Sequence, residues 1–216
     1  MKKEIKIIIP TSWEDITLRK WLELQKDLEN YSDDEEAMGA LMLHHLCNLS
    51  PDIIKQLPKS KYESIKERIN NLGNPEDLPL QRFVVIDGIE YGIEPNLGDM
   101  SYASYADISQ YESAGIDKNW GKIMSILYRP VKRKLNDLYE IEPYRAKIDD
   151  SKWLDIPMHI HFGTMFFFLA TSMDLYKDIL RFSKVEDMDH NTRQTLVESG
   201  NLILQSMNSR MGTYRG

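Results

Sequence analysis

Two β-forming runs around a turn lie in the middle of the chain, at residues 82–95, RFVVIDGIEYGIEP. The runs are rich in Val, Ile, Phe and Tyr, and the Asp87-Gly88 pair between them suits the positive backbone angles of a tight hairpin turn. A second candidate hairpin, VKRKLNDLYEIE at residues 131–142, turns at Asn136-Asp137. The fold must therefore accommodate one or two small antiparallel hairpins.

Helical periodicity covers most of the remaining sequence, with apolar residues every three or four positions. Thr17 and Ser101 are expected N-caps, while Ser32 and Ser60 each open a capping box with a glutamate three residues later. The predicted helices cover about residues 17–28, 32–46, 51–57, 60–72, 101–111, 118–128, 157–182 and 190–208.

The N-terminus predicts a short strand, because residues 3–9, KEIKIII, are rich in isoleucine and are followed by Pro10. Such a strand needs a pairing partner from elsewhere in this chain or from another chain. We therefore expect a mainly α protein of the α+β class. It would be a helical bundle with one or two small antiparallel β-hairpins and an N-terminal strand.

A linker-like segment, residues 74–79 (NPEDLP), makes the clearest compositional break in the chain. It divides the chain into residues 1–73, an N-terminal strand and helical bundle, and residues 80–216, a region of hairpins and helices. The second region includes the long apolar helix and the C-terminal helix. The two parts are expected either to separate near residues 73–80 or to pack as one domain.

The most hydrophobic segment, residues 156–170, does not fit a membrane span. It contains Pro157 and Gly163, and Asp174 and Lys177 follow before the roughly 20 apolar residues that a bilayer helix needs have accumulated. We expect a core helix instead, surrounded by its own domain or by a neighbouring subunit.

Net charge narrows the classes of function. The 216 residues include 34 Asp and Glu against 27 Lys and Arg, which gives a net charge of −7. Proteins that coat DNA or RNA neutralise phosphates with lysine and arginine, so this balance argues against nucleic acid as the partner. Cys47 is the only cysteine, so no internal disulfide can form, and the first residues lack the pattern of a secretory signal.

Metal-ligating residue types occur in two segments, His44 with Cys47 and His159 with His161. A structural zinc site needs four convergent ligands, so only a fold that brings both segments together would build one. As the alternative, these side chains are buried or interfacial, and we expect no metal and no cofactor. The sequence has no phosphate-binding glycine motif and no nucleophile elbow, so we expect a non-enzymatic protein, with a zinc-dependent enzyme as the lesser alternative.

Residues suited to protein contacts are the remaining candidates. Three tyrosines are spaced along one predicted helix, and tyrosine is enriched in interfaces. Four cationic side chains concentrate positive charge just after the predicted helix at 118–128. The alternatives are an aromatic-rich core for the tyrosines and a solvated strand face for the cations. The interface candidates are Tyr102, Tyr105, Tyr111, Arg129, Lys132, Arg133 and Lys134.

A distinctive combination of segments fills the central part of the chain. The segments are FVVIDGIEYGIEPNLGDMSYASYADISQYE (83–112), NWGKIMSILYRPV (119–131), IEPY (141–144) and WLDIPMHIHFGTMFFFL (153–169). With the opening IPTSWEDITLRKWLELQKDL, they resemble a group of small virion-associated proteins from the structural gene blocks of crAss-like and related tailed bacteriophages of Bacteroidetes. The resemblance leaves out the C-terminal helix and carries no catalytic motif.

The resemblance implies a non-enzymatic phage structural protein of the neck or tail region, a ring-forming adaptor that acts through protein–protein interfaces. Its partners would be other virion proteins, such as portal, neck or tail components, and further copies of itself in a homo-oligomeric ring. It would lie in the virion, and in the host cytoplasm during assembly, with no membrane partner. A tail-assembly chaperone that is absent from the mature virion is the alternative from a different class.

Overall fold

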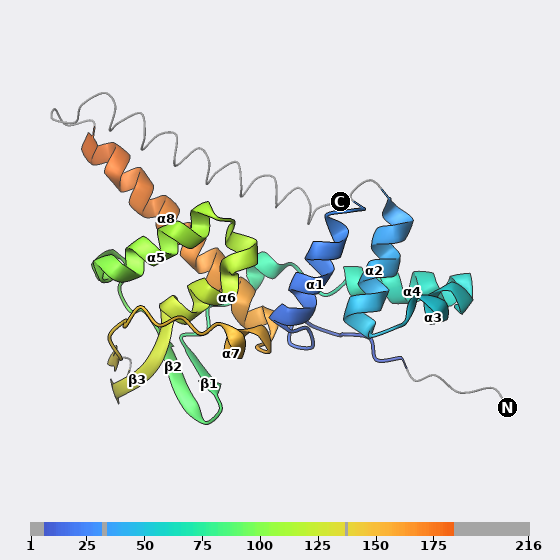
Figure 1. Cartoon of the computed structure of the whole chain (residues 1–216), viewed down its shortest axis with the longest axis horizontal. Helices are drawn as coiled ribbons and strands as arrows, with labels where there is room; N and C mark the ends of the chain where they lie inside the picture. The colour runs from blue at the N-terminus through green and yellow to red at the C-terminus, as the bar shows by residue number, and fades with distance from the viewer. Residues whose placement is uncertain (1–6, 32–33, 137, 184–216) are drawn as a thin grey trace. The chain divides into compact units, whose positions relative to one another are not determined.

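The computed structural model describes residues 7–31, 34–136 and 138–183 (Figure 1). The chain divides into two compact units, Met1–Thr164 and Met165–Gly216. The first unit contains seven α-helices, two 3-10 helices, the whole sheet and the start of an eighth α-helix among the described residues. This arrangement confirms the expected α+β class.

Four helices precede the sheet in the chain. They are α1 (Leu18–Leu28), α2 (Glu35–Cys47), α3 (Pro51–Gln56) and α4 (Lys59–Asn70), followed by the 3-10 helix η1 (Pro75–Asp77). The Thr17 hydroxyl accepts a hydrogen bond from the Lys20 amide at 3.4 Å, and the Ser50 hydroxyl accepts one from the Ile53 amide at 3.4 Å. Each bond satisfies an amide that the first turn of a helix leaves unpaired, so the predicted starts of α1 and α3 are confirmed.

The two predicted capping boxes are wrong. Helix α2 begins after Asp34, whose carboxylate accepts from the Ala37 amide at 2.9 Å, whereas Ser32 lies outside the described residues. Helix α4 begins at Lys59 with Pro58 as its N-cap, which places Ser60 inside the helix. An aspartate cap adds negative charge at the positive end of the helix dipole, and a proline holds φ near the helical value without a side-chain bond.

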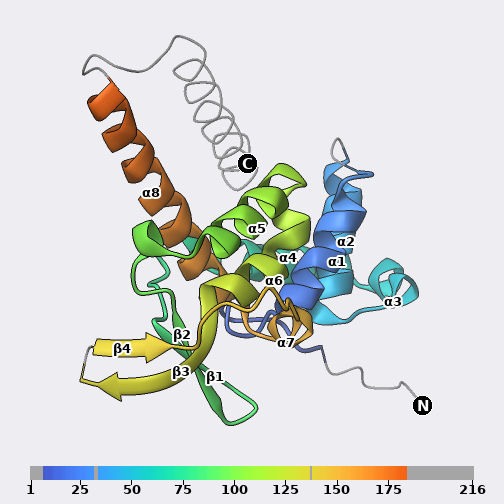
Figure 2. The same cartoon turned by 60° about the vertical axis from the view of Figure 1, so that its left-hand side comes forward.

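The two hairpins form one antiparallel sheet in the order β1-β2-β3-β4 (Figure 2). Its strands are β1 (Phe83–Ile86), β2 (Ile89–Ile93), β3 (Tyr128–Leu135) and β4 (Leu138–Ile141). Both predicted hairpins are confirmed, with positive φ at Asp87 (52°) and Gly88 (78°) in the first turn and at Asn136 (53°) in the second. The hairpins are joined because β2 pairs with β3, where Gly92 lies opposite Arg129.

Two α-helices and a short 3-10 helix connect the hairpins. The 3-10 helix η2 (Leu97–Asp99) leads to α5 (Tyr102–Ser113) and then to α6 (Ile116–Leu127), which runs directly into β3. Ser101 caps α5 as predicted, because its hydroxyl accepts from the Ser104 amide at 3.2 Å. Helix α6 forms the centre of the core, since Trp120, Ile123 and Met124 are almost fully buried.

Buried polar contacts hold the junction between the sheet and the helices that follow it, α7 (Ser151–Leu154) and α8 (Met158–Ser183). The Tyr128 hydroxyl donates to the Gln81 carbonyl at 2.6 Å and lies 2.9 Å from the Thr164 hydroxyl. The ring of Trp153, fully buried on α7, lies 5.2 Å from the Tyr128 ring. A tyrosine buried in this way needs such partners for its hydroxyl.

Residues on both sides of the 74–79 segment belong to the one compact unit that ends at Thr164. The Leu18 amide donates to the Ile156 carbonyl at 3.1 Å, and the Met158 amide donates to the Ile16 carbonyl at 2.7 Å. At Gly163 an added Cβ would overlap the Pro79 carbonyl, so the 74–79 segment packs directly on α8 there. The segment is therefore part of a packed unit.

The two ends of the chain account for the other expected elements. The predicted long apolar helix is confirmed as α8, and within its apolar run Phe168 is buried while Phe167 is exposed. No helix among residues 7–183, with the gaps at 32–33 and 137, has the length and apolarity to cross a membrane. Residues 7–9 form no strand, while residues 3–6 and the predicted helix at 190–208 lie outside the described residues.

Candidate functional site

Helix α5 presents two tyrosines to solvent at its N-terminal end. The exposed fractions of Tyr102 and Tyr105 are 84% and 60%, whereas Ile108, on the same stripe, is buried. Tyr111 is half-buried, and the Lys122 ammonium lies 5.0 Å from the centre of its ring. The tyrosine stripe therefore turns from solvent to core along the helix, and of its three tyrosines Tyr102 and Tyr105 are the ones accessible to a partner.

The cationic candidates lie on β3, where glutamates of neighbouring strands neutralise both lysines. The Lys132 ammonium lies 2.9 Å from the carboxylate of Glu140 on β4, and this contact lowers the pKa of Glu140. The Lys134 ammonium lies 2.7 Å from the carboxylate of Glu90 on β2 and 3.5 Å from the centre of the Phe83 ring. These lysines match the alternative of a solvated strand face.

Arg129 and Arg133 differ in their surroundings. Arg129 forms an ion pair with Glu94 in which both side chains are largely buried, with exposed fractions of 12% and 14%. Arg133 is exposed on β3, opposite Glu140 in the strand register. The structure thus divides the predicted cluster into one buried structural ion pair and a set of surface charges, and the cluster is not a continuous positive patch.

Two leucines at the tip of the second hairpin are exposed, which the sequence pattern did not predict. Leu135 and Leu138 face each other across the turn and have exposed fractions of 72% and 76%. At the first hairpin tip Val85 and Ile89 are also exposed. Leu135 and Leu138 flank the Asn136-Asp137 pair in the sequence. Their exposure could have been predicted from this position, because residues at a hairpin tip extend beyond the elements that cover a sheet.

The second hairpin is fixed to the sheet by Tyr139, which pairs with Lys134 next to the leucine tip. The Tyr139 ring lies over Gly92, where a side chain would collide with it, and the Tyr139 hydroxyl donates to the Ile93 carbonyl at 2.7 Å. The centre of the Phe83 ring lies 4.8 Å from that of Tyr139, and burial raises the pKa of Tyr139. A bare glycine covered by an aromatic ring is a recurrent way to fix strand register, so Tyr139 holds β4 against the sheet next to the tip.

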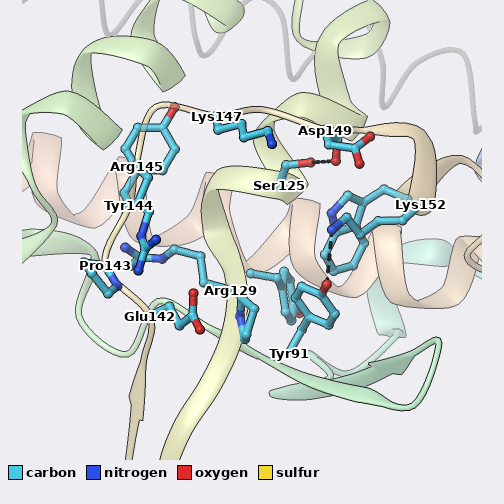
Figure 3. Close-up of a pocket in the computed structure, with 13 residues that line it drawn as sticks. Tyr91, Ser125, Arg129, Glu142, Pro143, Tyr144, Arg145, Lys147, Asp149 and Lys152 are labelled. Atoms are coloured by element: carbon cyan, nitrogen blue, oxygen red, sulfur yellow. Dashed lines mark hydrogen bonds between the residues drawn. The ribbon is translucent and has the colours of Figure 1, made fainter.

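A polar hollow of about 170 Å³ lies beside β3, beneath the segment that follows β4 (Figure 3). In Figure 3, Arg129, Glu142 and Tyr144 lie at one end of the hollow, while Tyr91 and Lys152 lie at the other. The charged side chains among its lining are Arg129, Glu142, Arg145, Lys147, Asp149 and Lys152. Aromatic rings from β2, β3 and α7 form its apolar walls.

The histidines and the cysteine that could bind a metal each have their own surroundings in the structure. His161 is fully buried on α8, its Nε2 lies 3.0 Å from the Trp153 carbonyl oxygen, and burial lowers its pKa to about 3. Burial raises the pKa of the Cys47 thiol to about 11, and His44 Nδ1 lies 2.6 Å from a backbone carbonyl oxygen. His159 is half-buried. Within the described part of the chain, no group of three or more His, Cys, Asp or Glu side chains could hold a metal ion.

No protein-family model, curated protein or solved structure matches this chain. Function is therefore inferred from the geometry of the described residues. Three surfaces stand out in it: the exposed tyrosines of α5, the leucine tip of the second hairpin and the polar hollow.

Proposed function

We propose that this chain is a non-enzymatic structural protein of the neck or tail region of a tailed bacteriophage, a ring-forming adaptor that acts through protein–protein interfaces. The observation that carries the proposal is the exposure of Leu135 and Leu138 at the tip of a hairpin that Tyr139 fixes to the sheet. Neighbouring apolar side chains that are exposed on an ordered element are typical of a surface that a partner covers.

The tyrosines of α5 supply a second contact surface of different composition. Tyr102 and Tyr105 are large, partly polar side chains that lose little conformational entropy on binding. Two unlike surfaces on one chain suit head-to-tail contacts, in which the leucine tip of one copy meets a different surface of the next. Contacts of this type close into rings when the rotation between copies permits.

The assignment to a phage particle is supported by the sequence resemblance of the central segments to virion-associated proteins of tailed bacteriophages. The fold agrees with a role in contacts, because the hairpins and α5 project side chains from ordered elements. Partners under this proposal are portal, neck or tail proteins and further copies of the chain.

Quantitative mass spectrometry of purified particles tests the proposal. We expect the chain at a fixed copy number per particle, and we expect the purified chain to form a cyclic oligomer by light scattering. A chain that is abundant in infected cells but missing from particles would contradict the structural role. That result is the one that the tail-assembly chaperone predicts.

A further inference from the structure

The polar hollow has a positive charge balance in a chain that is acidic overall. Its lining holds four cationic side chains and two carboxylates, but Arg129 is already paired with Glu94, so the balance of the others is 3 − 2 = +1, while the whole chain carries −7. Concave sites with low-dielectric walls strengthen the field of the charges that line them. The hollow is therefore a local attractor for an anionic group.

Hydrogen bonds from Ser151, and then the nearby charges of Lys152 and Lys147, lower the pKa of the Asp149 carboxylate, so this carboxylate offsets part of the positive charge of the hollow. The Asp149 carboxylate accepts from the Ser151 amide at 3.2 Å and from the Ser151 hydroxyl at 2.6 Å, which directs it to the start of α7. Arg145 and Lys147 are exposed, and neither makes a hydrogen bond or a contact ion pair within the described residues. These two cations are thus available to a ligand.

Arg129 contributes a buried donor. One terminal nitrogen of its guanidinium is paired with Glu94, but its Nε–H is buried and has no hydrogen-bond partner among the described residues. Buried donors without a partner are rare in folded proteins, because the lost hydrogen bonds to water are not replaced. Arg129 lines the hollow, so a small shift of its side chain would present this donor to an acceptor oxygen bound there.

The segment above the hollow is pinned on both sides of a strained residue. The Tyr144 hydroxyl donates to the Asp107 carboxylate of α5, and the Ser125 hydroxyl donates to the Asp149 carbonyl at 2.8 Å. Between these anchors Ala146 has a φ of 53°, a value that alanine rarely adopts. The strained alanine separates the two available cations, and such strain persists where the surrounding structure enforces it.

We propose that this hollow is a docking site for a carboxylate side chain on an acidic segment of a partner protein. The cations would pair with the carboxylate, while the aromatic walls would pack on the aliphatic stem of a glutamate or aspartate. A nucleic acid would need a row of available cations along its phosphates, but Lys132 and Lys134 on β3 are already paired with glutamates. This inference rests on the proposed function in one respect: the acidic segment is expected to belong to a neighbouring protein of the particle.

Titration of the full-length chain with acetyl-tetraglutamate amide, followed by amide NMR, tests the docking site. We expect saturable shifts at the amides of Arg145, Lys147 and Lys152, and no saturable shifts with acetyl-tetraglutamine amide. Shifts that are the same for both peptides would overturn the proposal. A short single-stranded oligonucleotide that binds the same amides more tightly than the acidic peptide would also overturn it.

A pair of matched double variants separates the hollow from general charge effects. The R145Q/K147Q variant removes two exposed cations of the hollow, and we expect about tenfold weaker peptide binding, as two partly desolvated charge pairs are lost. The K132Q/R133Q variant removes two exposed cations on β3 and should bind within about twofold of the unmodified chain. Equal weakening in both variants would overturn the proposal. Because the titration uses the isolated chain, its result is independent of whether the chain is found in particles.

Discussion

The two hairpins of the sheet lie in opposite surroundings. In the first, Val84 and Ile86 of β1 and Tyr91 and Ile93 of β2 are buried. In the second, every described residue of β3 from Lys132 onward is exposed. Turn chemistry decides that a hairpin forms, whereas the neighbouring elements decide whether its side chains join the core. The first hairpin is therefore part of the core, and the second is available to a partner.

The largest expected loss of stability comes from the buried ion pair of β3, in contrast to the surface charges of the same strand. Replacing Arg129 by methionine leaves Glu94 buried without its cation, and we expect the free energy of unfolding to fall by about 3–5 kcal/mol. The matched control is Lys132→Met, which removes an exposed cation and should leave the urea midpoint almost unchanged. Similar midpoints for the two variants would show that the Arg129 pair is not a core feature.

The next effect compares apolar side chains of the two hairpins. Ile93→Ala in β2 removes a buried side chain, and we expect a loss of about 2–4 kcal/mol in urea unfolding. Leu138→Ala in β4 removes an exposed side chain of similar size, so the stability should change by less than about 0.5 kcal/mol. A large loss for Leu138→Ala would mean that the leucine tip is covered within the chain.

A smaller effect tests the packing that joins the hairpins. In Gly92→Ala the new methyl group would lie about 2.9 Å from the Tyr139 ring, and we expect a loss of about 1–3 kcal/mol as the ring is displaced. Gly98→Ala is the control, because its nearest atom is 3.4 Å away. NMR shifts of the Tyr139 ring should change in the first variant and stay the same in the second.

The smallest effect concerns one hydrogen bond. Tyr139→Phe keeps the ring over Gly92 but removes the donor to the Ile93 carbonyl, for an expected loss of about 1 kcal/mol. Tyr102→Phe, on the exposed side of α5, should leave the unfolding curve unchanged. If the Tyr139→Phe variant is as stable as the unmodified chain, the packing of the ring alone fixes the hairpin and the hydrogen bond contributes nothing.

Features set by neighbouring residues in the chain were predictable from the sequence. The positive φ values at Asp87, Gly88 and Asn136 and the caps at Thr17 and Ser101 follow from local chemistry. The union of the hairpins was not predictable, because it pairs residues 91–93 with residues 128–130 through two intervening helices. Local propensity contains no information on such distant pairs.

The sequence predicts which residue types form the candidate site, but it does not predict their burial or their partners. Spacing identified the tyrosine stripe, but the burial of Ile108 and Tyr111 depends on how α5 packs. The cations of β3 were visible in the sequence, but their partners, such as Glu90 and Glu94, come from another part of the chain. The polar hollow depends on the path of residues 142–149, which have no regular secondary structure.

The copy number of the chain in purified particles, compared between the unmodified chain and an L135S/L138S variant, tests the central claim most directly. Both leucines are exposed, so the variant should fold normally, as its urea midpoint would show. We predict a fixed number of unmodified chains per particle and a strong depletion of the variant. Equal incorporation of both chains, or the absence of both from particles, would contradict a role for the hairpin tip as an assembly surface.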